Sequence, residues 1–216
     1  MGYDRYVEES LKNVAEVFYP AQNCMSSPVV LRTIHTWADE LKVYEADAVH
    51  FNAGHWDTVR IYGDEPLTPV DAYADNIRRI ANRIRFLFPN AKIIFATSTP
   101  VYEKEFLHEF EERRNSDVER YNAAACKALA DMDVTINDLY GLMKDKPDSM
   151  FSDQTHYYTA EATKLLGGQV TRTLCELLDI DQSLVTYPDA QKYDRVGEFT
   201  PDKEMYEKRG HIYVQK

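Results

Sequence analysis

Apolar residues along this chain form two kinds of pattern, short continuous runs and longer stretches with helical spacing. The short runs are rich in β-branched or aromatic residues and have turn-forming residues nearby, which is typical of β-strands. In the longer stretches, apolar side chains recur every three or four residues, which predicts helices with one buried face. The runs predict strands at residues 14–21, 47–54, 91–100 and 134–140, and the spacing predicts helices at residues 3–13, 27–42, 70–88, 118–132 and 159–178.

The order of these elements indicates the fold class. Strand and helix alternate along most of the chain, which favours a mostly parallel sheet with helices on both faces, a three-layer α/β/α domain. The chain opens directly in a helix, whereas a doubly wound sheet normally has a strand before its first helix. Such sheets also have about five strands or more, whereas the sequence predicts four. We therefore expect a flavodoxin-like sheet whose first strand is missing from the sequence.

The last part of the chain differs in composition. Residues 183–216 are rich in Tyr, Asp, Lys and Pro and show little apolar periodicity, which is typical of a surface-wrapping or mobile tail. Within it, only the segment HIYVQ at residues 211–215 looks like a strand. We therefore expect one α/β domain over residues 1–180 and a polar tail over residues 181–216.

Composition and charge narrow the possible partners. A chain of 216 residues with 44% apolar content is long enough for one sizeable core. Its net charge of −11 repels nucleic-acid backbones and anionic lipid surfaces, so we expect neither nucleic acid nor membrane as a partner. The charged run at residues 103–114 is expected to be the solvated face of a helix. The compartment is unknown from the sequence, although the cytoplasm follows if Met1 is the true start.

The residues that usually bind metals and cofactors are not arranged for that purpose. The cysteines Cys24, Cys126 and Cys175 show no C-x-x-C spacing, and the histidines show no metal-ligand spacing. Glycine-rich loops that cradle phosphates are also absent. We therefore expect no metal and no organic cofactor.

The segment FSDQTHYYTA places Asp153 three residues before His156, just ahead of the last predicted helix. In a turn, a carboxylate at this spacing can accept a hydrogen bond from the imidazole, which fixes the tautomer needed for acyl-transfer chemistry. The same D-x-x-H spacing occurs at Asp47 and His50, but on a predicted strand, where side chains three apart point to opposite faces. A turn aspartate followed by a half-exposed histidine at a helix start is the alternative interpretation of Asp153 and His156.

Two other polar segments follow predicted strands. Gly54 and Asn52 lie in the segment FNAGHWD, and Asn23 lies in the segment PAQNC. Because active sites of open α/β sheets gather at the carboxyl ends of strands, these residues are candidates for a site beside Asp153 and His156. Glycine and asparagine that only close turns are the alternative.

In this arrangement the chain resembles the SGNH/GDSL hydrolases, a family of GDSL-like lipases, acylhydrolases and esterases. That family has a flavodoxin-like α/β/α fold, a Gly-Asp-Ser block after its first strand, a Gly or Asn after its second, a Gly-x-Asn-Asp block after its third, and a Ser/Asp-x-x-His block before its last helix. Here Ser152 precedes Asp153-x-x-His156, which matches the last block, and Gly54-His-Trp-Asp57 matches the third. The resemblance extends in element order over about residues 1–180.

The chain departs from the family pattern at two blocks. Trp56 stands where the family has an asparagine that helps to form the oxyanion hole, so Asn52 or Asn23 could supply that donor instead. The Gly-Asp-Ser block that carries the nucleophile is absent. The serines present, none of which follows a strand in that context, are Ser10, Ser26, Ser27, Ser98, Ser116, Ser149, Ser152 and Ser183.

The resemblance implies hydrolysis of an acyl ester or a carbohydrate acetyl ester through a serine acyl-enzyme. His156 is then the general base, Asp153 orients it, and Gly54 with Asn52 or Asn23 donates hydrogen bonds to the oxyanion. Because no nucleophilic serine is identified, we expect this chain to be inactive or impaired. Two alternatives stay open, a non-catalytic module that binds a glycan or acyl group and a flavodoxin-like interaction domain.

A missing first strand also bears on the oligomeric state. In the related fold that strand pairs with two neighbours near the centre of the sheet, and each buried backbone group left unpaired costs about 1–3 kcal/mol. Residues 211–215 are the strand-like candidate to fill the gap, from the same chain or from a partner. We therefore expect a small-molecule or carbohydrate ester as substrate and a possible homodimer that exchanges its C-terminal tails.

Overall fold

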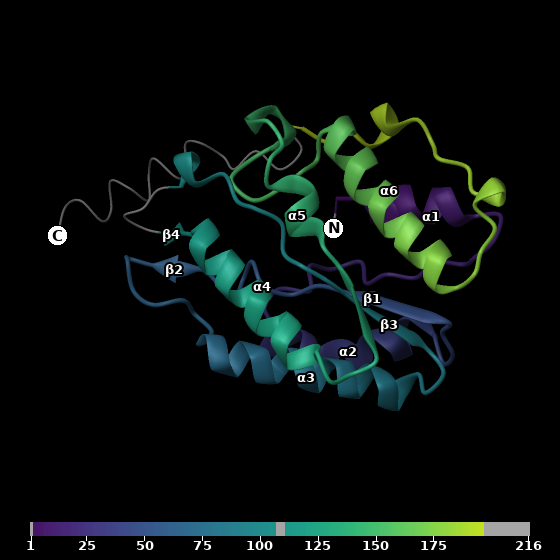
Figure 1. Ribbon diagram of the computed structural model, residues 1–216, viewed down its shortest axis with the longest axis horizontal. Helices are drawn as coiled ribbons and strands as arrows, with labels where there is room; N and C mark the ends of the chain where they lie inside the picture. Colours follow the sequence, from purple (N-terminus) through teal and green to yellow (C-terminus); the bar gives the residue numbers. More distant parts are fainter. Residues whose placement is uncertain (1, 107–110, 197–216) are drawn as a thin grey trace.

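The computed structural model describes residues 2–106 and 111–196 and shows three layers (Figure 1). The middle layer is a sheet of three parallel strands, β1 (Ala48–Phe51), β3 (Lys92–Ala96) and β5 (Val134–Asn137), in the order β1-β3-β5. Three of the predicted strands are thus confirmed, together with the α/β/α class. The registers pair Phe51 with Phe95 and Phe95 with Ile136, so the three strands end at nearly the same level.

Helices cover both faces of the sheet (Figure 1). On one face lie α2 (Ser27–Leu41), α3 (Val70–Leu87) and α4 (Asn115–Leu129), and on the other lie α1 (Asp4–Leu11), α5 (Leu139–Met143) and α6 (Ala160–Leu177). Each helical layer has its own core: Tyr73, Ile77 and Phe95 belong to the first, and Leu11, Ala96 and Leu166 belong to the second. The apolar stripes that predicted these helices are the faces buried in the two cores.

Residues 14–21 do not form the predicted strand; they run as irregular chain from α1 toward α2. Their small apolar residues Val14, Ala15 and Val17 pack against the core of the α1–α6 layer, whereas Phe18 is 48% exposed. The apolar run therefore marks a partly buried segment and not a strand. A strand, however, also needs a hydrogen-bonding neighbour on the sheet, and β1 pairs only with β3 among the described residues.

The charged run at residues 103–114 was expected to be a helix face, and this expectation is wrong for the residues that the structure describes. Glu103–Glu105 form a single 3-10 turn, and β4 (Glu111–Glu112) pairs antiparallel with β2 (Arg60–Ile61). The run is also not fully solvated, since Glu112 and Arg113 are buried.

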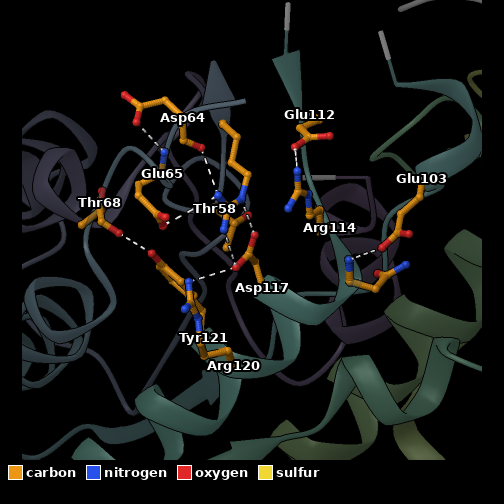
Figure 2. Close-up of polar contacts among 12 residues, drawn as sticks. Thr58, Asp64, Glu65, Thr68, Glu103, Glu112, Arg114, Asp117, Arg120 and Tyr121 are labelled. Carbon is orange, nitrogen blue, oxygen red and sulfur yellow. Dashed lines mark hydrogen bonds and ion pairs between the residues drawn. The ribbon is translucent and has the colours of Figure 1, made fainter. Parts of the chain in front are cut away.

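Buried ion pairs explain why this short ribbon tolerates so many charges. Arg60 on β2 forms two hydrogen bonds with Asp117 on α4, Nε to Oδ2 at 2.7 Å and Nη2 to Oδ1 at 3.2 Å. Figure 2 shows Asp117 near the start of α4 with Arg120 beside it, and Glu112 beside Arg114. Burial of these charges is possible because each carboxylate faces a guanidinium.

The polar segment after α6 returns along the α1–α6 layer as far as the structure describes it. Two short 3-10 turns lie in it, Gln182–Leu184 and Ala190–Tyr193, and the Tyr193 ring packs edge-on to Tyr6 with centroids 5.6 Å apart. The Asp194 carboxylate accepts a hydrogen bond from the Ala160 N–H at the start of α6. The predicted strand at residues 211–215 lies outside the described residues.

Candidate active site

The pair Asp153 and His156 lies in a tight loop between the 3-10 turn Asp148–Met150 and α6. The Nδ1 atom of His156 lies 2.7 Å from Oδ2 of Asp153 and 2.9 Å from Oδ1. Oδ1 of Asp153 also accepts hydrogen bonds from the backbone N–H groups of Thr155 and His156, both at 2.8 Å. The loop is therefore an Asx-turn, a conformation in which an aspartate organises the backbone that follows it.

The electrostatics of this pair are those of a carboxylate that orients an imidazole. Burial opposes ionisation of Asp153, but hydrogen bonds from the His156 ring and from the Thr155 and His156 N–H groups outweigh it, so the pKa of this carboxyl is lowered. An ionised Asp153 accepts the Nδ1 proton of His156. The Nε2 lone pair is then left to take a proton, and Nε2 has no hydrogen-bond partner among the residues that the structure describes. The two side chains are 42% (His156) and 13% (Asp153) exposed, so solvent and small molecules can reach the imidazole.

The imidazole of His156 is supported on one face by an aromatic ring. Tyr158 stacks on it with centroids 4.8 Å apart and an interplanar angle of 12°, and the Arg195 guanidinium lies 5.1 Å from the Tyr158 centroid. Ser152 closes the loop, because its hydroxyl donates to the His156 carbonyl and accepts the Tyr158 N–H. Tyr158 therefore contacts the candidate base directly.

The carboxyl end of β1 is held against the carboxyl end of β3. A Cβ atom on Gly54 would lie 2.2 Å from the Ser98 hydroxyl, so glycine is what allows this close approach. Asn52 uses its amide hydrogens within the protein, donating to the Ala96 carbonyl at 2.7 Å and to the Ser98 hydroxyl at 3.3 Å. Asn52 therefore ties the two strand ends together, and a role as oxyanion donor would require it to release one of these bonds.

Next to Gly54, the His55 ring contacts the segment that follows β3. Its Nε2 atom is 3.2 Å from the Thr99 hydroxyl, while its Nδ1 atom is buried and has no hydrogen-bond partner in the described residues. Burial, together with the positive charges of Arg113 and His156, lowers the pKa of His55 to about 3. His55 is thus a neutral neighbour of His156.

Two hydrogen bonds, one between backbone groups and one from a side chain, join the segment after β3 to the loop of the candidate base. The Tyr102 N–H donates to the Gln154 carbonyl at 2.8 Å, and the buried Tyr157 hydroxyl donates to the Pro100 carbonyl at 3.1 Å. Residues after β3 therefore contact the loop on both sides of His156. Sequence patterns do not reveal such contacts, because carbonyl and N–H groups are common to all residues.

The remaining predicted residues lie apart from this pair. Asn23 accepts the Met25 N–H at 2.8 Å and makes no hydrogen bond to Gly54 or His156 in the described chain. Asp47 and His50, the second D-x-x-H copy, are not bonded to each other: His50 contacts the Asn137 amide at 3.3 Å, and the Asp47 carbonyl accepts the Lys92 N–H.

The serines nearest to strand ends are engaged elsewhere. Ser27 is fully buried and donates to Asp57 at 2.6 Å, and Ser98 is 3% exposed beneath Gly54. Hydrogen bonds from a serine hydroxyl to the His156 ring are absent among the described residues. That part of the chain also holds no group of three metal-ligating side chains, and none of its helices is both long and apolar enough to span a membrane.

Comparison with known proteins gives a consistent result. No protein-family model matches the sequence. The chain is 27% identical over 121 residues to the rice (Oryza sativa subsp. japonica) GDSL esterase/lipase WDL1, a match that covers 51% of this chain and 46% of that protein. The match thus spans about half the length of this curated relative.

Solved structures of low sequence identity share the fold. A GDSL-like lipase from Bacteroides thetaiotaomicron superposes with a TM-score of 0.62 at 15% identity, covering 81% of this chain and 82% of that one. A lipase/acylhydrolase from Enterococcus faecalis gives 0.59 at 16% identity, covering 85% and 86%. A carbohydrate esterase family 3 protein from Talaromyces cellulolyticus gives 0.55 at 18% identity, covering 73% and 70%. The chain thus shares the α/β/α fold of these hydrolases, and over about half of its length it is similar in sequence to a GDSL esterase/lipase.

Proposed function

We propose that this protein serves in the hydrolysis of an ester, with His156 as the general base and Asp153 as the residue that orients it. The observation that carries the proposal is the 2.7 Å contact between His156 Nδ1 and Asp153 Oδ2, which leaves Nε2 free to take a proton. During acyl transfer the imidazole becomes positively charged, and an ionised Asp153 stabilises that charge.

We further propose that the oxyanion formed during the reaction is stabilised at the β1 end. Gly54 lies there, and its backbone N–H is the proposed first donor. Asn52 and Asn23 are the side-chain candidates for a second donor. Asn52 now donates hydrogen bonds to Ala96 and Ser98, so it would have to break one of them to donate to the oxyanion.

The proposed substrate is a small acyl ester or an acetyl ester on a carbohydrate. Support comes from the names of similar proteins, which include a GDSL esterase/lipase and a carbohydrate esterase. A Trp56 ring that is 42% exposed two residues after Gly54 suits contact with the flat face of a sugar.

We also propose that the 216 residues alone have little or no esterase activity. A general base must lie within about 2.6–3.2 Å of the hydroxyl it activates. The described serines make no hydrogen bond to His156 Nε2. Ser27 and Ser98 are buried, and their hydroxyls form hydrogen bonds with Asp57 and Asn52 instead. The nucleophile is then supplied by a segment that these residues do not contain.

The test is an assay of the purified chain with p-nitrophenyl acetate, alone and after fusion to a strand that ends in Gly-Asp-Ser. We expect the fusion to gain activity, and we expect Ser→Ala in the added block or His156→Ala to remove it by a factor of about 100 or more. An unfused chain that turns over rapidly and reacts with a fluorophosphonate would contradict this proposal, and Ser26, Ser27 and Ser98 would then be mutated in that order. Binding of acetylated sugars without turnover in any version would favour the non-catalytic module.

A further inference from the structure

Two asparagines of α4 form hydrogen bonds with the backbone of the segment that follows β3. Oδ1 of Asn122 accepts the Ser98 N–H at 2.8 Å, and its Nδ2 donates to the Ser98 carbonyl at 2.9 Å. Asn115 repeats this pattern with Val101, again at 2.8 Å and 2.9 Å. Each amide thus satisfies both backbone groups of one residue, as a neighbouring strand would do.

The spacing of these two contacts matches the geometry of a helix beside an extended chain. Asn115 and Asn122 are seven residues apart, which is two helical turns and a rise of about 10.5 Å. Ser98 and Val101 are three residues apart, which is about 10 Å in extended chain. The two asparagines therefore lie on one face of α4 and hold the extended segment along its length.

This segment, residues 98–102, is also the one that contacts the loop of His156. The Pro100 carbonyl, between Ser98 and Val101, accepts a hydrogen bond from the Tyr157 hydroxyl. The Tyr102 N–H, just after Val101, donates to the Gln154 carbonyl. Aromatic contacts add to these bonds, because Phe151 lies against both Tyr102 and Tyr157, with centroids 5.4 Å and 4.4 Å apart. Residues 98–102 thus connect α4 to the loop that holds Asp153 and His156.

We propose that Asn115 and Asn122 are positioning residues that hold residues 98–102 in place and thereby fix the Asp153–His156 pair. The proposal rests on the proposed function only in giving that pair its role as base and orienting acid. Neither asparagine contacts the imidazole, so their effect must travel through the bonds at Pro100 and Tyr102.

The experiment is solution NMR of the full chain, with two readouts at the pair itself. One is the low-field proton resonance of His156 Nδ1–H, and the other is the pKa of the Asp153 carboxyl followed by its ¹³C shift. The variants are Asn115→Ala, Asn122→Ala and Tyr157→Phe, the last of which removes only one hydroxyl. Leu129→Ala is the matched control, because Leu129 is buried on the same helix, seven residues beyond Asn122, and belongs to the core of the α2–α3–α4 layer.

We expect all three variants to broaden or shift the His156 resonance and to raise the Asp153 pKa toward its ordinary value. At equal loss of thermal stability, Leu129→Ala should leave both readouts unchanged. Unchanged readouts in the asparagine variants and in Tyr157→Phe, or the same changes in Leu129→Ala, would overturn the proposal. If an asparagine variant does not fold, Tyr157→Phe decides. These signals do not depend on turnover, so failure of the esterase assay is distinguishable from failure of this inference.

Discussion

Besides the candidate base, two partly buried histidines, His50 and His55, set how this protein responds to acid. His50 on β1 lies beside the Asn137 amide, and burial lowers the pKa of its ring to about 4. His55 has a pKa of about 3 for the same main reason. Both rings are therefore neutral in the native state at neutral pH, whereas the same rings in the unfolded chain titrate near 6.5.

The first prediction concerns stability against pH. Between pH 6.5 and about 4, the unfolded chain binds protons at these histidines and the native chain does not, so stability falls as the pH falls through this range. We expect each ring to contribute about 1–3 kcal/mol to that fall. Urea unfolding at about pH 7.5 and pH 5 should show a smaller loss for His50→Gln than for the unchanged chain. His35→Gln, at an exposed position on α2, is the control and should not alter the pH dependence.

Single residues also show how much of the candidate site was readable from the sequence. The contact between Asp153 and His156 depends on a turn of four residues, so spacing and context predicted it and distinguished it from Asp47 and His50. Asn52 was readable as a residue at a strand end, but its partners Ala96 and Ser98 lie on another strand. Contacts between distant segments leave no pattern in either segment alone.

At the scale of elements, the same distinction separates the correct predictions from the wrong ones. Apolar periodicity located the five long helices and three strands, because the buried face of each element is marked by apolar residues in that element's own sequence. Residues 14–21 carry an equally apolar run, yet they are not a strand in the structure, since pairing depends on a neighbour. The run at residues 103–114 has helical composition, but its residues Glu111 and Glu112 pair with β2, a strand that lies about fifty residues earlier in the chain. Arg60 on β2 also forms an ion pair with Asp117, just after the run.

The second prediction concerns that ribbon. The side chains of Arg60 and Asp117 are only 11% and 6% exposed, so removal of Asp117 leaves the buried Arg60 charge with only the exposed Glu65 carboxylate, 3.7 Å away. We expect Asp117→Ala to destabilise the protein by about 3–5 kcal/mol, measured by urea unfolding. The matched control is Asp131→Ala, which breaks the ion pair of Asp131 with Arg78. These side chains are 68% and 42% exposed, so this loss of stability should be much the smaller of the two. Equal losses in the two variants would show that the buried pair does not hold the ribbon to α4.

At the scale of the whole molecule, β1 stands out as a strand whose two edges are unequal. One edge pairs with β3, and the other has no strand beside it in the described residues. Ala48, Val49 and His50 are accordingly half-buried, whereas four consecutive residues of β3 are buried. An unpaired edge at this place, between two helical layers, is a position where another extended segment can add to the sheet.

The third prediction is that the tail segment at residues 210–216 fills this place, in the same chain or in a partner. Each backbone group of β1 that gains a hydrogen bond removes a cost of about 1–3 kcal/mol, so loss of the segment should be visible in a melting curve. We expect deletion of residues 210–216 to lower the Tm by about 4 °C or more. If the segment comes from a partner, the deletion also converts a dimer to a monomer in sedimentation. A variant of full length with Ile212→Asp and Val214→Asp is the control for chain length, and it should behave like the deletion because charges at alternate positions disfavour insertion between two apolar layers. An unchanged Tm and an unchanged sedimentation coefficient in both variants would mean that the edge of β1 is covered by some other segment.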